Sequence, residues 1–164
     1  MSLTTIQELI ELAIITEKNN KSFYEGLADK FLHVPSASKF WNQYVEEEQG
    51  HADWLINLLA SLPRERRFQP AAPTAVEAAR KAAGVSPEHL LSKIHNLADA
   101  FETASELEFS ETNTVFEFLI SSFATDRKVH AFLRSQLQEH SARLISTHLE
   151  IDNNHERSSI LASR

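Results

Sequence analysis

The residues best suited to chemistry in this sequence are a glutamate and a histidine three positions apart, Glu48 and His51. On a helix this spacing places both side chains on one face, where a carboxylate oxygen and an imidazole nitrogen can bind a single ion. Glu17, on the preceding helical stretch, adds a carboxylate able to bridge to a second ion. The chain has no cysteine, which excludes thiolate zinc sites, iron–sulfur clusters and cysteine nucleophiles. The donors that remain favour iron or manganese.

Glu17, Glu48 and His51 are expected at one depth of a helical hairpin. The chain breaks between two helical stretches at Pro35, because proline cannot continue a helix. With Val34 as the tip, Glu17 lies as far before it as His51 lies after it, and Glu48 lies a turn nearer to it. A rise of about 1.5 Å per residue puts the three within roughly 5 Å of one level. Carboxylates buried there without a countercharge cost several kcal/mol each, so the pattern predicts bound cations.

A second set of acids, with a histidine, is expected from the C-terminal half of the chain. With Thr112 as the tip of a second hairpin, Asp99 and Asp126 lie at nearly equal distances on either side of it. His130 lies about a turn beyond Asp126, and Glu102 lies about a turn closer to the tip than Asp99. Asp99 matches the level best, and a tighter turn would bring Glu102 into range. The candidate metal ligands are thus Glu17, Glu48, His51, Asp99, Glu102, Asp126 and His130.

The remaining polar residues are assigned to supporting or surface positions. Tyr24 lies two turns after Glu17 on the same stripe, where it can donate a hydrogen bond to a ligand or line the site. The other acids and histidines are expected in solvent or at the rim of the bundle: Glu46, Glu47, Glu106, Glu108, Glu111, His140, His148 and His155.

Four long helices in two hairpins must position these residues. Thr5 and Glu8 have the spacing of a capping box at the start of the first helix, and Ser86-Pro87 has the form of a helix start. The expected helices span residues 5–31, 37–62, 86–109 and 114–151. The connection 63–86 is long enough to run the length of a bundle, which favours a crossover over simple up-down-up-down order.

One domain accounts for the chain: an all-α four-helix bundle over residues 1–151, followed by a polar tail, 152–164, that is expected to fray. The 164 residues include 3 glycines and 5 prolines, too few for a turn-rich all-β fold. The net charge of −7 disfavours nucleic acid and acidic membranes as partners. No apolar run approaches the ~18 residues of a membrane span, and the first residues lack the basic charge of a leader peptide. A cytoplasmic location is therefore expected.

The motifs of the first hairpin resemble those of a rubrerythrin-like protein of the ferritin-like superfamily. They are Ala13-x-x-x-Glu17, Phe23-Tyr24 and Glu47-Glu48-x-x-His51. In the second half, Ala98-x-x-x-Glu102 and His130-Ala131 repeat them loosely. The resemblance extends from about residue 5 to about residue 151.

The resemblance implies a ferritin-like four-helix bundle with a long crossover between its second and third helices. Such proteins are usually dimeric and carry a di-iron or iron–manganese carboxylate centre. Members reduce peroxide, oxidise ferrous iron or hydroxylate substrates. The implied ligand positions are Glu17, Glu48 and His51 in the first half, and Asp99, Glu102 and His130 in the second.

The second half departs from the family pattern at Arg127, which stands where its Glu-x-x-His would have the glutamate. Asp126 follows the buried stripe and is the expected substitute. An inward-pointing Arg127 would instead pair with Glu17 or Glu102, and its permanent charge would repel a second metal ion. The centre would then hold one ion or none.

Three hypotheses remain open. The first is a protein that binds two iron ions, or iron and manganese, with oxidase, peroxidase or ferroxidase character, and that acts as a homodimer. Because a chain without cysteine carries no rubredoxin-type domain, its electrons would come from a separate donor protein. The second is a non-catalytic bundle in which Arg127 and histidines replace the metals and the surface serves assembly or partner binding. The third is a single-ion site at Glu17, Glu48 and His51 without turnover.

Overall fold

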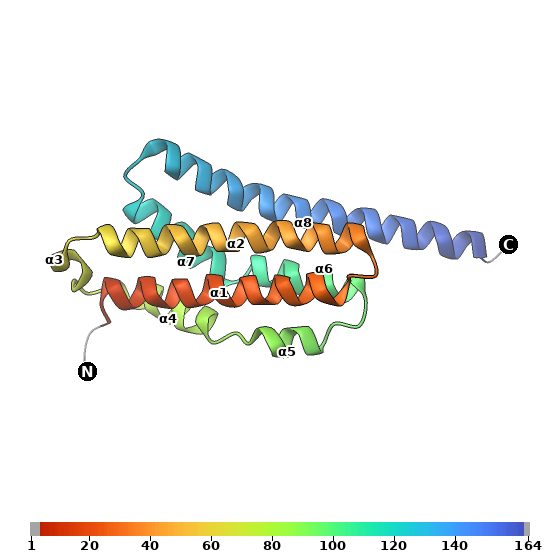
Figure 1. The fold of residues 1–164 in the computed structure, drawn as a ribbon, viewed down its shortest axis with the longest axis horizontal. Helices are drawn as coiled ribbons and strands as arrows, with labels where there is room; N and C mark the ends of the chain where they lie inside the picture. The colour runs from red at the N-terminus through yellow and green to blue at the C-terminus, as the bar shows by residue number, and fades with distance from the viewer. Residues whose placement is uncertain (1–3, 163–164) are drawn as a thin grey trace.

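The chain folds into helices joined by short connections (Figure 1). A computed structural model describes residues 4–162, without the side chains of residues 111–113, 149 and 151–162. Within this part of the chain there are eight helices, and no strand beyond an isolated bridge between Thr5 and Pro70. In chain order the helices are α1 (Ile6–Lys30), α2 (Pro35–Ser61), α3 (Arg64–Arg67), α4 (Pro73–Ala83), α5 (Pro87–Ser92), α6 (Leu97–Glu108), α7 (Glu111–Phe123) and α8 (Arg127–Ala162). The all-α fold expected from the sequence is confirmed.

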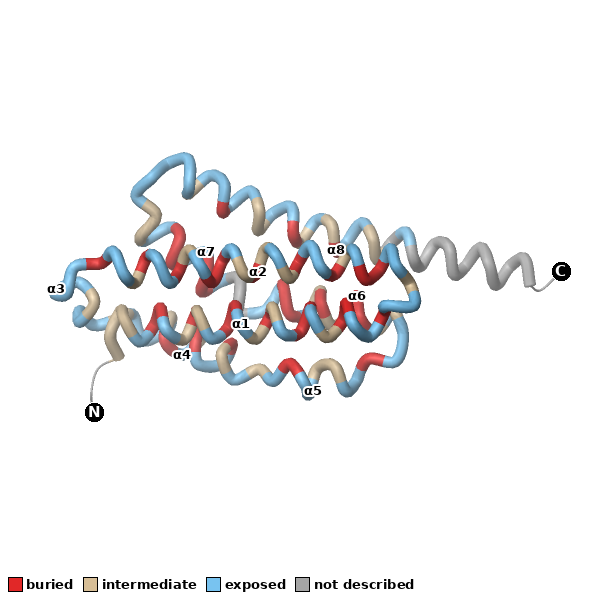
Figure 2. Tube along the Cα trace, in the orientation of Figure 1, coloured by how far each residue is buried: buried red, intermediate tan, exposed pale blue. Residues whose placement is uncertain are grey.

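The first two long helices form the hairpin that the sequence predicts. A capping box starts α1: the Thr5 N–H donates to Glu8 Oε2 at 2.7 Å, and the Glu8 N–H donates to Thr5 Oγ1 at 3.3 Å. Pro35 is the first residue of α2, where a missing N–H leaves no helical hydrogen bond unmade. Buried positions recur along both helices (Figure 2), so each directs an apolar stripe into the core.

The segment after α2 forms the long crossover of the bundle. α3, α4 and α5 run beside α1 from one end of the molecule to the other (Figure 1), and both α4 and α5 pack against α1. Asn19 Nδ2 donates to the carbonyls of Ala83 and Val85 at 3.2 and 3.3 Å, which ties the crossover to α1. The third rod of the bundle therefore starts at the end where α1 finishes.

The second hairpin differs from its expected boundaries. Its first rod consists of α6 followed by α7, interrupted at residues 109–110, and the chain reverses at residues 124–126 before α8. The tip predicted at Thr112 was therefore wrong. Ser110 donates its hydroxyl to the Leu107 carbonyl at the end of α6, and the polar stretch that follows begins α7 without turning the chain back.

Two acids that were expected in the middle of helices instead lie at helix starts. Asp126 precedes α8, and its Oδ1 accepts the Lys128 N–H at 2.7 Å. Before α6, Asn96 Oδ1 accepts the Asp99 N–H at 2.9 Å, and Asp99 Oδ2 accepts the His95 N–H at 2.8 Å. Both carboxylates thus satisfy backbone donors that a helix start leaves unpaired.

The last helix, α8, forms the fourth rod and packs most closely against α6 and α7. It continues to Ala162, past the boundary expected at residue 151. Residues 163–164 of the expected polar tail lie outside the described part of the chain. Among the described residues, none of the helices combines the length and apolarity that a membrane span requires.

Two apolar clusters occupy the two halves of the bundle. One contains Tyr24, Trp41 and Phe101, and the other contains Leu9 and Leu55. On α1 and α2 the stretch between these clusters carries buried polar side chains. Burial of such groups is costly unless hydrogen bonds or countercharges compensate for it, so the middle of the bundle is the candidate functional region.

The glycines in the interiors of α1 and α2 offer a matched pair of substitutions. A Cβ added at Gly26 would clash with Leu91 Cδ1 on α5, whereas a Cβ added at Gly50 would meet nothing within 4 Å. We expect Gly50→Ala to raise the free energy of unfolding by about 1 kcal/mol, because alanine is the better helix former. The free energy of unfolding of Gly26→Ala should be about 1 kcal/mol lower than that of Gly50→Ala, because the half-buried Leu91 side chain must move. Urea unfolding followed by circular dichroism measures the free energy of unfolding of both variants. An equal increase in the two variants would contradict the packing of α5 on α1.

Candidate metal centre

Glu17, Glu48 and His51 meet between α1 and α2, at the level that the sequence predicts. Their side chains are 4%, 3% and 2% exposed. His51 Nδ1 lies 3.5 Å from Glu17 Oε2 and 3.6 Å from Glu48 Oε2. One ligand atom from each residue lies within 4.8 Å of the other two, close enough for a shared ion. The first cluster is therefore present as buried donors on two helices.

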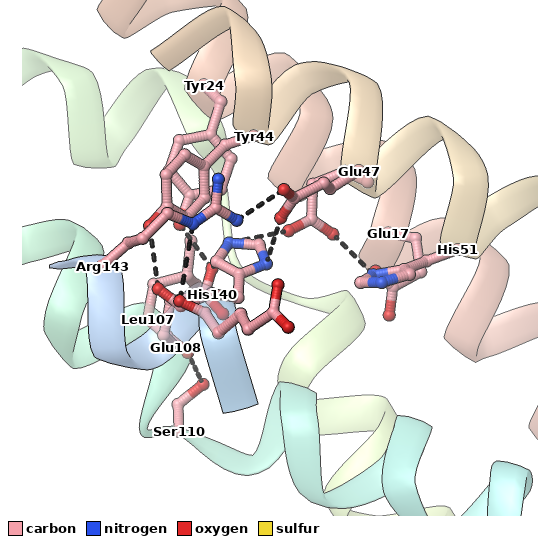
Figure 3. Close-up of polar contacts among 12 residues, drawn as sticks. Glu17, Tyr24, Tyr44, Glu47, His51, Leu107, Glu108, Ser110, His140 and Arg143 are labelled. Carbon is pink, nitrogen blue, oxygen red and sulfur yellow. Dashed lines mark hydrogen bonds and ion pairs between the residues drawn. The ribbon is translucent and has the colours of Figure 1, made fainter. Parts of the chain in front are cut away.

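A second cluster adjoins the first and uses Glu48 again. His140 Nε2 lies 3.7 Å from Glu48 Oε1 and 3.3 Å from Glu108 Oε1. Glu108 is the last residue of α6 and His140 lies on α8, and both are buried. The two oxygens of Glu48 thus face different histidines: Oε2 faces His51 and Oε1 faces His140. Figure 3 shows His51 beside Glu17, and His140 with Glu108 on the other side of the group.

The acids and histidine expected from the second hairpin lie outside both clusters. Glu102 and Asp126 are exposed, and Asp99 and His130 are half-buried. Asp99 and Asp126 are occupied at helix starts, as described above. Arg127, the first residue of α8, is exposed, so it does not enter the core as a countercharge.

Glu108 and His140 were expected at the surface or the rim, and the error follows from the misplaced tip. With Thr125 in the true turn as the tip, Glu108 and His140 lie at nearly equal distances along the chain before and after it. Glu17 and Glu48 are placed in the same way about the tip of the first hairpin. A further signal was available in Ala104-x-x-x-Glu108, which repeats the Ala-x-x-x-Glu pattern of α1.

Burial and crowding perturb the ionisable groups of both clusters. Burial, and next the Glu17 carboxylate, raises the pKa of Glu48 well above its usual range. Burial lowers the pKa of His51, but the Glu17 and Glu48 carboxylates outweigh it and raise that pKa to about 10. For His140 burial again lowers the pKa, and the Glu108 carboxylate with its neighbours raises it above the ordinary value. The raised pKa values favour protonated His51 and His140 in the absence of metal, and binding of metal would displace these protons.

Two tyrosines support the second cluster. Tyr24 donates its hydroxyl to Glu108 Oε1, and Tyr44 donates its hydroxyl to the His140 carbonyl oxygen at 2.8 Å. Burial, and next the charge of Glu108, raises the pKa of Tyr24 well above its usual range, so Tyr24 stays protonated and remains a donor. Tyr24 is thus hydrogen-bonded to a buried acid that could hold a metal, although the acid is one that sequence reasoning missed.

Glu47 on α2 and Arg143 on α8 form an ion pair that joins the two helices. Arg143 makes an ion pair with Glu47 Oε1, and its guanidinium lies 5.0 Å from the centre of the Tyr44 ring. Glu47 Oε2 lies 3.1 Å from His140 Nδ1, at an ion-pair distance without hydrogen-bond alignment. In Figure 3, dashed lines join Arg143 to Glu47 and Glu47 to His140. Glu47, expected in solvent, therefore flanks the second cluster.

Each of the two donor groups could hold a metal ion that prefers oxygen and nitrogen ligands. His140 Nε2 lies between two carboxylates, yet it makes no hydrogen bond within the described residues. Ferritin-like two-metal centres take a glutamate from each of two helices and a Glu-x-x-His from each of the other two. Glu17 and Glu108 supply the single glutamates. The second Glu-x-x-His lacks its glutamate, because Leu137 stands three positions before His140.

Comparison with known protein families matches residues 8–122 to the family described as Rubrerythrin. The matched segment contains Glu17, Glu48, His51 and Glu108, and ends before His140. Comparisons with curated proteins and with solved structures gave no match. The family match spans well over half of the chain. The helical bundle of the chain, with buried Glu and His groups that could hold metal, agrees with this family match. The chain belongs to the rubrerythrin family.

Proposed function

We propose that the protein binds two iron ions, or one iron and one manganese, and uses them as an oxidase, peroxidase or ferroxidase. The observation that carries the proposal is the position of Glu48, whose two oxygens face two separate histidine and acid clusters. A single buried carboxylate shared in this way is suited to join two ions. The family match supports iron as the metal.

Each residue of the centre has a distinct part in this proposal. Glu17 and His51 hold one ion, Glu108 and His140 hold the other, and Glu48 belongs to both. The chemistry that such a pair supplies is one-electron exchange between ferrous and ferric states. The apolar clusters on either side exclude water, which strengthens electrostatic interactions within the site.

The surroundings of the centre complete the proposal. Tyr24 holds Glu108 in place through its hydroxyl. Because the chain has no cysteine, the proposal includes a separate electron-donor protein, and by family resemblance it includes a homodimer. Neither nucleic acid nor a membrane enters the proposal as a partner.

The competing function is a bundle without metal, in which protons on the histidines balance the buried carboxylates. The raised pKa values of His51 and His140 favour this reading, since both rings would then carry the positive charge. Arg127 has no part in it, because that side chain is exposed. The two functions differ in metal content.

Metal content tests the proposal directly. The metal-free chain is loaded with ferrous iron, passed through a desalting column and measured by elemental analysis. We expect two irons per chain, because two groups of buried donors are present. Glu102→Gln is the matched control: its exposed carboxylate lies outside both clusters, so this variant should also keep two. One iron per chain would indicate the single-ion site, and none would indicate the metal-free bundle.

A further inference from the structure

A cavity lies beside the second cluster, between α8 and the junction of α6 with α7. Its volume is about 510 Å³, within the range of roughly 300–1,000 Å³ typical of small-molecule sites. Glu108 and Leu137 both line it. A larger cavity of about 630 Å³ between α2 and α8 is lined by Glu47 and Arg143 but by none of the five residues of the two clusters. Of these two cavities, the smaller is lined by a candidate ligand, Glu108.

Leu137, which lines this cavity, lies three positions before His140. It occupies the position of the glutamate that the second Glu-x-x-His lacks, so the second cluster has one carboxylate fewer than the family pattern. Two divalent ions carry four positive charges, and the carboxylates of Glu17, Glu48 and Glu108 carry three negative ones. One positive charge remains in a buried site, where an unbalanced charge is costly. A single additional anion would balance it.

The apolar side chains that line the cavity indicate that the anion also has an apolar chain. Phe109 and Ile145 line the cavity while remaining 63% and 46% exposed, and Leu137 and Ala142 add further apolar surface. Peroxide or dioxygen would leave most of this volume empty. An apolar chain would cover the exposed Phe109 and Ile145 side chains, which is favourable at about 25 cal/mol per Å² of apolar surface.

We propose that this cavity binds a small organic acid with an apolar chain, whose carboxylate takes the place of the glutamate missing at Leu137. The inference rests on the proposed two-metal centre. The carboxylate lies at the part of the cavity that Glu108 lines, where Glu108 Oε1 is 3.3 Å from His140 Nε2, and the apolar chain lies toward Phe109 and Ile145. Rubrerythrin-type chemistry in this chain would then act on, or be regulated by, an amphipathic carboxylate.

Binding of octanoate to the chain loaded with two manganous ions tests the inference by calorimetry, without relying on activity. We expect octanoate to bind at least tenfold more tightly than octanol, which lacks the charge, and than acetate, which lacks the chain. Removal of the metal should weaken octanoate binding at least tenfold. Equal binding of octanoate and octanol would overturn the inference, because the carboxylate would not be recognised.

Two variants locate the binding site. Leu137→Glu restores the missing carboxylate, so it should keep two ions and weaken octanoate binding at least tenfold. Ala142→Phe fills the cavity from an exposed position on α8 and should weaken octanoate binding similarly, and it decides the matter if Leu137→Glu does not fold. Ala131→Phe is the matched control, exposed on the same helix but away from the cavity, and should bind octanoate like the unaltered chain.

The outcomes separate this inference from the proposed function. A chain that binds two ions but no octanoate would overturn the inference and leave the metal centre in place. Unchanged octanoate binding by Ala142→Phe would also overturn it. A chain that binds no metal would overturn both proposals together.

Discussion

Replacing Glu48 by glutamine should remove both metal ions, whereas replacing Glu17 by glutamine should remove about one. Glu48 is the residue common to the two clusters, with one oxygen facing each histidine. Glutamine keeps the shape of the side chain and removes the charge that both ions need. Elemental analysis after ferrous loading gives the stoichiometry of each variant.

The thermal stability of Glu48→Gln distinguishes a metal centre from a buried ion pair. Each ion at about 100 times its Kd should stabilise the unaltered chain by roughly 2.7 kcal/mol, so each should raise Tm by about 5–10 °C for a chain of this size. The variant should show no such rise. In the absence of metal it should be at least as stable as the unaltered chain, because burial already raises the pKa of Glu48 and disfavours its charge. A variant that retains both the ions and the Tm rise would contradict the shared position of Glu48.

Replacing Arg143 by glutamine should weaken binding of the second ion by roughly 10–100-fold, as is typical when a partner that orients a ligand is lost. Arg143 holds Glu47, and Glu47 Oε2 lies 3.1 Å from His140 Nδ1. Loss of a positive charge near a metal ion would by itself strengthen metal binding. A weaker second ion with an unchanged first ion therefore identifies positioning of His140 as the cause. Manganous titration followed by paramagnetic resonance measures the two affinities.

The same helix supplies the control for this prediction. Arg134 pairs with Glu117 at 3.0 Å, and both side chains are about half exposed. Exposed pairs of this kind contribute up to about 1 kcal/mol, and neither residue belongs to the two clusters, although both line the cavity beside Glu108. Arg134→Gln should leave both affinities unchanged. Equal losses in the Arg143 and Arg134 variants would show that any lost charge on α8 has the same effect.

The first hairpin could be predicted because one unambiguous signal marks its tip. Pro35 fixes the break, and counting outward from Val34 then brings Glu17, Glu48 and His51 to one level, where the structure places them. The apolar stripes on either side give the direction of each helix face. No tertiary information was needed for this half of the centre.

The second hairpin could not be predicted in the same way because no proline marks its turn. The polar residues 110–113 gave the expected tip, but the chain reverses at residues 124–126, inside the helix expected over residues 114–151. Asp99 and Asp126 have the sequence spacing of buried acids, yet their carboxylates bind backbone N–H groups at helix starts. Local hydrogen bonding of this kind is invisible to a count of apolar periodicity.

The two halves of the centre also differ in how far apart their residues lie along the chain. Glu17, Glu48 and His51 come from one antiparallel hairpin, whereas His140 lies on the last helix, far from Glu48 in the sequence. Contacts between distant residues form late, because closing a long loop lowers chain entropy before any contact compensates for it. We therefore expect the hairpin to bring its three donors together early during folding, and α8 to add His140 later.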